Sequence, residues 1–182
     1  CPWDLGTLEC AARNGHLGVL QWARAFGCPW HTTVCIAAAA ATNGHTEVLQ
    51  WIQAQDPSSL WGTSVCMWAA RGGHLSTLQW LRAQGCPWNE DTIAQAAMHG
   101  HIEVIQWSRA QTPPCPWDTS LCNGAAKYGH LHILRWAYKQ RPPPPWSWDA
   151  IEMAENAGHS AVATWLHENG SPIHTNMDED AD

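Results

Sequence analysis

One short motif recurs six times along the 182-residue chain, and it constrains the fold more than any other feature of the sequence. The motif is a Gly-His pair followed, six residues after the histidine, by a tryptophan. Its copies are Gly15-His16 with Trp22, Gly44-His45 with Trp51, Gly73-His74 with Trp80, Gly100-His101 with Trp107, Gly129-His130 with Trp136, and Gly158-His159 with Trp165. Successive copies lie 29, 29, 27, 29 and 29 residues apart. A fixed period of about 20 to 50 residues is typical of proteins built from stacked repeats.

A Pro-Trp dipeptide marks the start of most repeats. It stands at Pro2-Trp3, Pro29-Trp30, Pro87-Trp88, Pro116-Trp117 and Pro145-Trp146, and the third repeat keeps only the tryptophan, in Leu60-Trp61. Because proline disfavours helix in the residue before it, we expect the preceding helix to end there. The repeats then cover residues 1–27, 28–58, 59–85, 86–114, 115–144 and 145–173, and we expect the acidic tail, 174–182, to be disordered. Since Cys1 already belongs to a repeat, we expect the chain to be part of a longer protein.

The sequence pattern of each repeat predicts two short helices joined by a tight loop. The first, helix A, is expected over 5–13, 32–42, 63–71, 90–98, 119–127 and 148–156, and the second, helix B, over 17–26, 46–55, 75–84, 102–111, 131–140 and 160–169. The glycine between them suits a left-handed helix cap. Helices of about ten residues are unstable alone in water, so their stability must come from stacking. We expect the helix-B tryptophans to be buried and to supply much of it.

Composition excludes several classes of function. The net charge of −7, with only nine basic residues, gives no basic surface for nucleic acid. No apolar run approaches the roughly 18 residues of a membrane span. Two repeated positions account for twelve of the fourteen tryptophans, so an aromatic ligand site is not needed to explain them. We therefore expect a monomer that binds a protein partner, with neither nucleic acid nor membrane involved.

The histidines and cysteines could indicate a metal or catalytic site, but their positions favour a structural role. Residues one repeat apart cannot all lie within the roughly 2.0–2.3 Å of a zinc ion that its ligands require. We therefore expect no metal, no cofactor and no catalytic residue, with the pairs His99/His101 and His130/His132 as the exceptions to test. All eight cysteines are expected to be reduced. A metal-binding or enzymatic domain and a passive spacer remain alternative hypotheses.

Some helix-A positions vary from repeat to repeat over this constant pattern, as a recognition surface does. The candidate partner-binding residues are Trp68, Arg71, Gln95, Met98, His99, Lys127, Tyr128 and Trp148. Trp68 and Trp148 stand outside the repeated tryptophan positions, and tryptophan is enriched at binding hot spots. For both, packing in the core is an equal alternative. The segment 141–145, Arg followed by four prolines, is either an extended connector or a ligand for an SH3 or WW domain.

The run Ala-Ala-x-x-Gly-His-Leu-x-x-Leu-x-Trp-Leu at 69–81 resembles the second half of an ankyrin repeat. With its Cys-Pro-Trp turn, the repeat is similar to divergent ankyrin arrays of large DNA viruses of protists, algae and oomycetes. The resemblance implies an all-α solenoid of about six repeats that binds proteins through its concave, helix-A side, inside the cell (the host cytoplasm if viral).

Two departures from the ankyrin pattern change what is expected of the connectors. The repeat is shorter than the roughly 33 residues of the standard unit, and it lacks the Thr-Pro-Leu-His start. We therefore expect short turns in place of long β-hairpins. An alternative, by analogy with proteins that join such arrays to F-box segments, is the substrate-recognition part of a ubiquitin-ligase adaptor.

Overall fold

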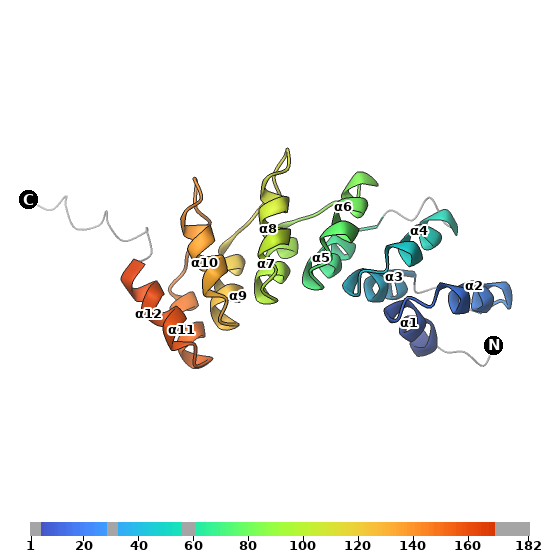
Figure 1. Ribbon diagram of the computed structural model, residues 1–182, viewed down its shortest axis with the longest axis horizontal. Helices are drawn as coiled ribbons and strands as arrows, with labels where there is room; N and C mark the ends of the chain where they lie inside the picture. The colour runs from blue at the N-terminus through green and yellow to red at the C-terminus, as the bar shows by residue number, and fades with distance from the viewer. Residues whose placement is uncertain (1–4, 29–32, 56–60, 170–182) are drawn as a thin grey trace, which may run out of the picture. The chain divides into compact units, whose positions relative to one another are not determined.

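A computed structural model describes residues 5–28, 33–55 and 61–169. The turns expected at Pro2-Trp3 and Pro29-Trp30 and the expected tail lie outside these residues. The described part contains twelve α-helices and no β-strand (Figure 1). They are α1 (Leu5–Arg13), α2 (Leu17–Ala25), α3 (Thr33–Thr42), α4 (Thr46–Gln55), α5 (Thr63–Arg71), α6 (Leu75–Ala83), α7 (Glu90–Met98), α8 (Ile102–Arg109), α9 (Thr119–Lys127), α10 (Leu131–Tyr138), α11 (Asp149–Asn156) and α12 (Ser160–Asn169).

The alternation of helix A and helix B is confirmed, with most boundaries within one residue of the prediction. Glycine ends each helix A, because the six glycines of the Gly-His pairs have φ between 69° and 82°, a region that side chains with a Cβ rarely adopt. The backbone N–H of the histidine then bonds back across the turn, as from His45 to the carbonyl oxygen of Ala40 at 2.9 Å. The same bond joins His130 to Ala125 at 2.8 Å. This turn closes each pair of helices.

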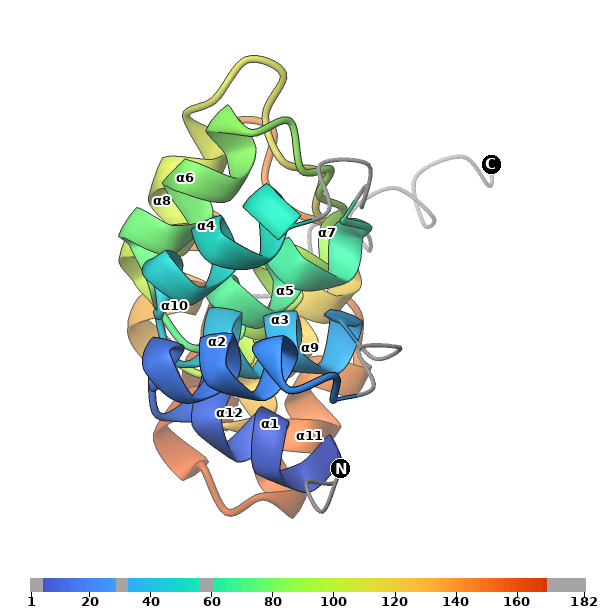
Figure 2. The ribbon, with the colours of Figure 1, turned by 90° about the vertical axis from the view of Figure 1, so that its right-hand side faces the viewer.

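The contacts divide the chain into two compact units, Cys1–Thr92 and Ile93–Asp182, and the boundary falls within α7. In the first unit, α1 packs on α2, α3 on α4, and α5 on α6, while α3 lies between α1 and α5. Figure 2 shows this layering, with α4 and α6 on one side and α3 and α5 on the other. In the second unit, α9 packs on α10, α11 on α12, and α9 on α11. Within each unit, helices A therefore form one layer and helices B the other.

The core of each unit is aliphatic, which corrects the expectation that the helix-B tryptophans are buried. The buried side chains of helix B include Leu49 and Ile52 in α4 and Leu78 and Leu81 in α6. Trp22 is 45% exposed and the other five helix-B tryptophans are half-buried. Five of the tryptophans follow a core leucine or isoleucine by two residues, and Trp165 follows the buried Ala163 in the same way. Two residues correspond to a turn of about 200° around the helix, which points each tryptophan away from the core.

The cysteines also differ from expectation at one position. Six of them are free thiols: Cys10, Cys35, Cys66, Cys86, Cys115 and Cys122. Cys28 is disulfide-bonded, so the expectation that all eight are reduced is wrong. Helices packed about 8–10 Å apart hold equivalent cysteines beyond the roughly 7 Å that a disulfide allows between Cα atoms. Cys28 lies beyond the end of α2, in a connector, where this spacing does not apply.

The connectors contain no regular element over 143–147, consistent with an extended path after α10. The peptide bonds Thr112-Pro113 and Arg141-Pro142 are cis. Pro144 is buried, and Trp146 is only 6% exposed. Pro144 of the proline-rich segment and the adjacent Trp146 therefore pack on the protein itself.

The position of the core leads to a test of which side chains stabilise the stack. Leu78→Ala removes a side chain with 0% exposure and should lower the free energy of unfolding by about 2–5 kcal/mol. Trp80→Ala removes a half-buried ring that contacts Trp61 at 5.7 Å between ring centroids, and it should cost less. Urea unfolding followed by circular dichroism measures both. A larger loss for Trp80→Ala would contradict the aliphatic core.

Candidate functional site

The histidines of three Gly-His pairs, His45, His74 and His130, each reach the preceding repeat. The Nε2 atom of His45 donates to the carbonyl oxygen of Arg13 at 2.9 Å, and that of His74 to Thr42 at 3.0 Å. In the second unit, His130 donates to Met98 at 3.1 Å. Every acceptor is the last residue of a helix A, where the carbonyl has no partner within its own helix. The hydrogen bond therefore satisfies a helix end and joins two repeats.

The glycine of the pair is needed for the same contact. A Cβ atom on Gly44 would lie 2.6 Å from Nδ1 of His74, and one on Gly15 would lie 2.6 Å from Nδ1 of His45. The imidazole of one repeat thus lies directly on the glycine of the repeat before it. His16, His74, His101 and His130 also occupy N-cap positions of helix B, without a side-chain capping bond to their own helix.

Burial and neighbouring groups shift the pKa values of several side chains in and near these contacts. Burial lowers the pKa of His130, and the nearby His132, His99 and His159 act in the same direction, while the bond to Met98 opposes them. Burial, with a smaller contribution from Asp118, raises the pKa of Cys122 to about 12. That thiol stays protonated at neutral pH and is a poor nucleophile. A hydrogen bond from Cys66 lowers the pKa of Cys86, but both side chains are buried.

A second repeated contact was not predicted: an arginine of helix B clamps the next Cys-Pro-Trp turn. The guanidinium carbon of Arg109 lies 3.7 Å from the ring centroid of Trp117, and its Nη1 donates to the carbonyl oxygen of Cys115 at 2.6 Å. Arg82 repeats this arrangement, at 4.1 Å from the Trp88 ring and with a hydrogen bond to the carbonyl oxygen of Cys86. The sequence signal is an arginine two residues after the helix-B tryptophan.

The turn tryptophan also contacts the tryptophan of helix B in the same repeat. Trp117 contacts Trp136 with ring centroids 6.2 Å apart, and Trp146 contacts Trp165 at 5.9 Å. In the last connector, Tyr138 takes the place of the arginine and contacts both Trp146 and Trp165, at 6.3 and 5.8 Å. The repeated tryptophans therefore fix the connectors to helix B.

Six of the eight candidate partner-binding residues lie in three places. Trp68 and Arg71 lie together on α5, with the guanidinium carbon 5.3 Å from the ring centroid. His99, Lys127 and Tyr128 come together at the C-terminal ends of α7 and α9: the His99 and Tyr128 rings stack at 6.5 Å, and Lys127 Nζ lies 5.7 Å from the Tyr128 ring. Trp148 precedes α11 and is 57% exposed.

Gln95 and Met98, on α7, are half-buried and differ from the other candidates. The Met98 side chain occupies the space that a Cβ on Gly124 would enter, 2.7 Å from its Cγ. Met98 therefore fills a gap on α9 that a larger residue at position 124 would close.

The helix-A layer of the first unit contains a hollow of about 500 Å³. We name it the Ala38 hollow; its lining is Glu9, Arg13, Cys35, Ala38, Ala39, Thr42, Asn43, Trp68 and Arg71. Its centre is α3, where Ala38 and Ala39 stand at the repeat positions that Met67 and Trp68 occupy in α5. Sequence analysis identified Trp68 and Arg71 but not this hollow, whose signal is the alanine run of α3.

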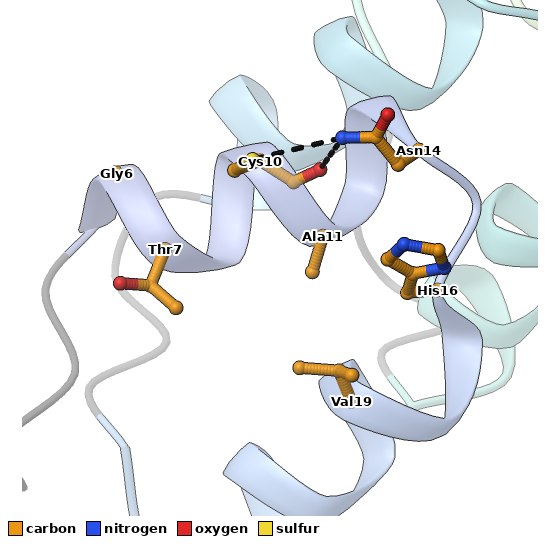
Figure 3. A pocket seen from close by; sticks show the side chains of 7 residues that line it. All are labelled: Gly6, Thr7, Cys10, Ala11, Asn14, His16 and Val19. Atoms are coloured by element: carbon orange, nitrogen blue, oxygen red, sulfur yellow. Dashed lines mark hydrogen bonds between the residues drawn. The ribbon is translucent and has the colours of Figure 1, made fainter.

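Two other hollows lie between the helices of single pairs. One is lined by Gly6, Thr7, Cys10, Ala11, Asn14, His16 and Val19 of α1 and α2. Figure 3 shows Ala11, His16 and Val19 around its opening, with Asn14 Nδ2 donating to the carbonyl oxygen of Cys10 at 2.8 Å. The other lies between α11 and α12, where His167 pairs with Glu155 at 3.1 Å. His16 is the counterpart of His45, so the first hollow is on the side through which the other repeats stack.

Two negative findings concern only residues 5–28, 33–55 and 61–169. This part of the chain has no group of three or more His, Cys, Asp or Glu side chains arranged to hold a metal ion. None of its helices has the length and apolar character needed to span a bilayer.

The Gly-His contact predicts that Gly44→Ala destabilises the chain for two reasons. The new Cβ is strained at φ 76° and collides with the His74 ring. Gly27→Ala is the matched control in the same unit, because its φ is 73° and nothing lies within 4 Å of the added Cβ. We expect Gly44→Ala to lower the free energy of unfolding by about 1–3 kcal/mol more than Gly27→Ala. Equal losses in urea unfolding would argue against the stacked imidazole.

If the arginine stabilises the fold by stacking on the turn tryptophan, its replacement by lysine should lower the stability although the charge is kept. Arg109→Lys keeps the charge but loses the planar stack on Trp117, and it should destabilise the chain by about 1 kcal/mol. Arg135→Lys, an exposed position on α10, should leave the melting temperature unchanged. Thermal unfolding of the two variants measures the difference, and equal melting temperatures would remove the clamp as a source of stability.

Comparison with known proteins finds similarity among solved structures. No protein-family model and no curated protein matches the chain. Among solved structures, the ankyrin repeat domain of human ASB11 superposes with a TM-score of 0.62 and 16% sequence identity, over 92% of this chain and 85% of that domain. Identity at this level shows the fold alone, and the chain accordingly has an ankyrin-like, all-helical repeat fold.

Proposed function

We propose that this chain is a non-catalytic interaction module that binds a protein partner through the helix-A layer of its repeats. The observation that carries the proposal is the exposure of large side chains in helices A or at their ends, at positions that vary between repeats. Trp148 is 57% and Tyr128 is 50% exposed, and Arg71 and Lys127 are exposed as well. The alanine pairs of α5 and α9 are buried.

The residues that recur between repeats support this assignment, because they already have structural roles within the fold. The glycines and histidines join repeats, and the helix-B tryptophans, with Arg82 and Arg109, hold the connectors. The groups with shifted pKa values, such as Cys122 and His130, belong to the core and to the repeat contacts. These roles favour binding over catalysis.

The proposed contact residues are Trp68, Arg71, Gln95, Met98, His99, Lys127, Tyr128 and Trp148. Aromatic residues, methionine and arginine are enriched in protein interfaces and dominate their hot spots. Layers built from short packed helices are rigid, so little conformational entropy is lost on binding. The ankyrin-like fold and the acidic net charge of −7 agree with a protein partner.

Photo-crosslinking in the cells that make the protein tests this function. Benzoylphenylalanine replaces Tyr128 or Trp148 in the helix-A layer, and Phe26, which follows α2 and is 66% exposed, as a matched aromatic control. We expect one protein to crosslink from positions 128 and 148 and not from 26. Crosslinks from position 26 alone, or from none of the three positions, would contradict a helix-A binding surface.

A further inference from the structure

We propose that the Ala38 hollow is the anchor site of the partner, and that it receives a peptide segment with one large apolar side chain next to a carboxylate. This inference rests on the proposed function and names the chemistry that the partner must present. Three observations on the first unit carry it: the small residues at the centre of the hollow, the satisfied polar groups of its floor, and the charges on its rim.

The hollow exists because α3 has alanine where its neighbour has large side chains. Ala38 and Ala39 correspond to Met67 and Trp68 one repeat later. The half-buried Trp68 forms a wall on α5, and Cys35 extends the floor along α3. An opening of about 500 Å³ is within the usual range of ligand sites, about 300–1,000 Å³. It is large enough for a leucine, methionine or aromatic side chain.

The polar groups around the floor already have partners inside the protein. Thr42 Oγ1 donates to the carbonyl oxygen of Ala38 at 2.8 Å, and Asn43 Nδ2 donates to that of Ala39 at 2.8 Å. The carbonyl oxygen of Thr42 accepts from His74. An apolar guest on this floor therefore leaves these carbonyl groups satisfied, and burial of its surface favours binding.

The rim adds a positive charge to an otherwise acidic chain. The lining of the hollow contains two arginines, Arg13 and Arg71, and one acidic residue, Glu9, which pairs with Arg13 at 3.2 Å. Stacking on Trp68 orients the Arg71 guanidinium beside the opening. A guanidinium binds a carboxylate through two parallel hydrogen bonds, so an acidic residue beside the apolar anchor fits this rim.

Selection from a phage-displayed library of random 12-residue peptides on the intact chain tests the assignment. We expect the enriched sequences to share a large apolar residue beside Asp or Glu. A synthetic peptide of that sequence is then titrated by fluorescence polarisation. Replacing its acidic residue by the matching amide should weaken binding about tenfold, which is about 1.4 kcal/mol.

Protein variants localise the peptide. Ala38→Met fills the hollow with the side chain that the next repeat carries at this position, and it should weaken binding at least about tenfold. Ala54→Met, an exposed position on α4 in the same unit, is the matched control and should bind like the unsubstituted chain. Arg71→Glu changes an exposed residue and should also weaken binding, so the test does not depend on the folding of Ala38→Met.

Two outcomes would overturn the inference: no enriched peptide, or a peptide whose affinity is the same for Ala38→Met, Arg71→Glu and Ala54→Met. Crosslinking from positions 128 and 148 would still stand in that case, and the interaction module would then bind elsewhere. The converse result, a peptide lost with Ala38→Met but no protein crosslinked in cells, would support the anchor chemistry and contradict the proposed function.

Discussion

The contact on which the rest of the structure depends is the imidazole of one repeat lying on the glycine of the repeat before it. It meets three requirements at once. The glycine turns the chain at positive φ, the missing Cβ makes room for the ring, and the ring donates to a carbonyl that the end of helix A leaves unsatisfied. Helices of eight to ten residues are unstable alone. This contact sets the register in which they stack, which explains why the Gly-His pair is the most constant feature of the sequence.

The helix-B tryptophans contact the connectors between repeats and do not fill the core, as their abundance suggested they would. A ring two residues beyond the core leucine faces away from the core, where it meets the turn tryptophan of its own repeat. The arginine of the preceding helix B covers that second ring and bonds the turn carbonyl, as Arg109 does over Trp117. Connectors that contain proline have few backbone N–H groups with which to bond to the helices. Stacked rings and a guanidinium hold them in place.

Sequence reasoning located the helices because glycine and proline mark their ends, and these local effects do not depend on the neighbours. It placed the tryptophans wrongly because it counted them as apolar without following their angle around helix B. The arginine clamp was missed because its two parts, such as Arg82 and Trp88, lie in different repeats with connectors of unequal length. The Ala38 hollow was missed because a hollow depends on the side chains of three helices together, which the sequence of one helix does not show.

The hollow also shows how a repeat protein can gain specificity without changing its framework. The Gly-His contact, the aliphatic core and the clamp use helix ends, inward faces and connectors, so the outward positions of helix A are free to vary in size. Large residues there, such as Trp68, project from the layer, while small ones, such as Ala38, leave an opening beside them. Under the proposed function, a partner would have to match both, because a flat apolar surface would meet Trp68 and leave the opening unfilled. The small side chain at Ala38 and the large one at Trp68 therefore shape this surface together.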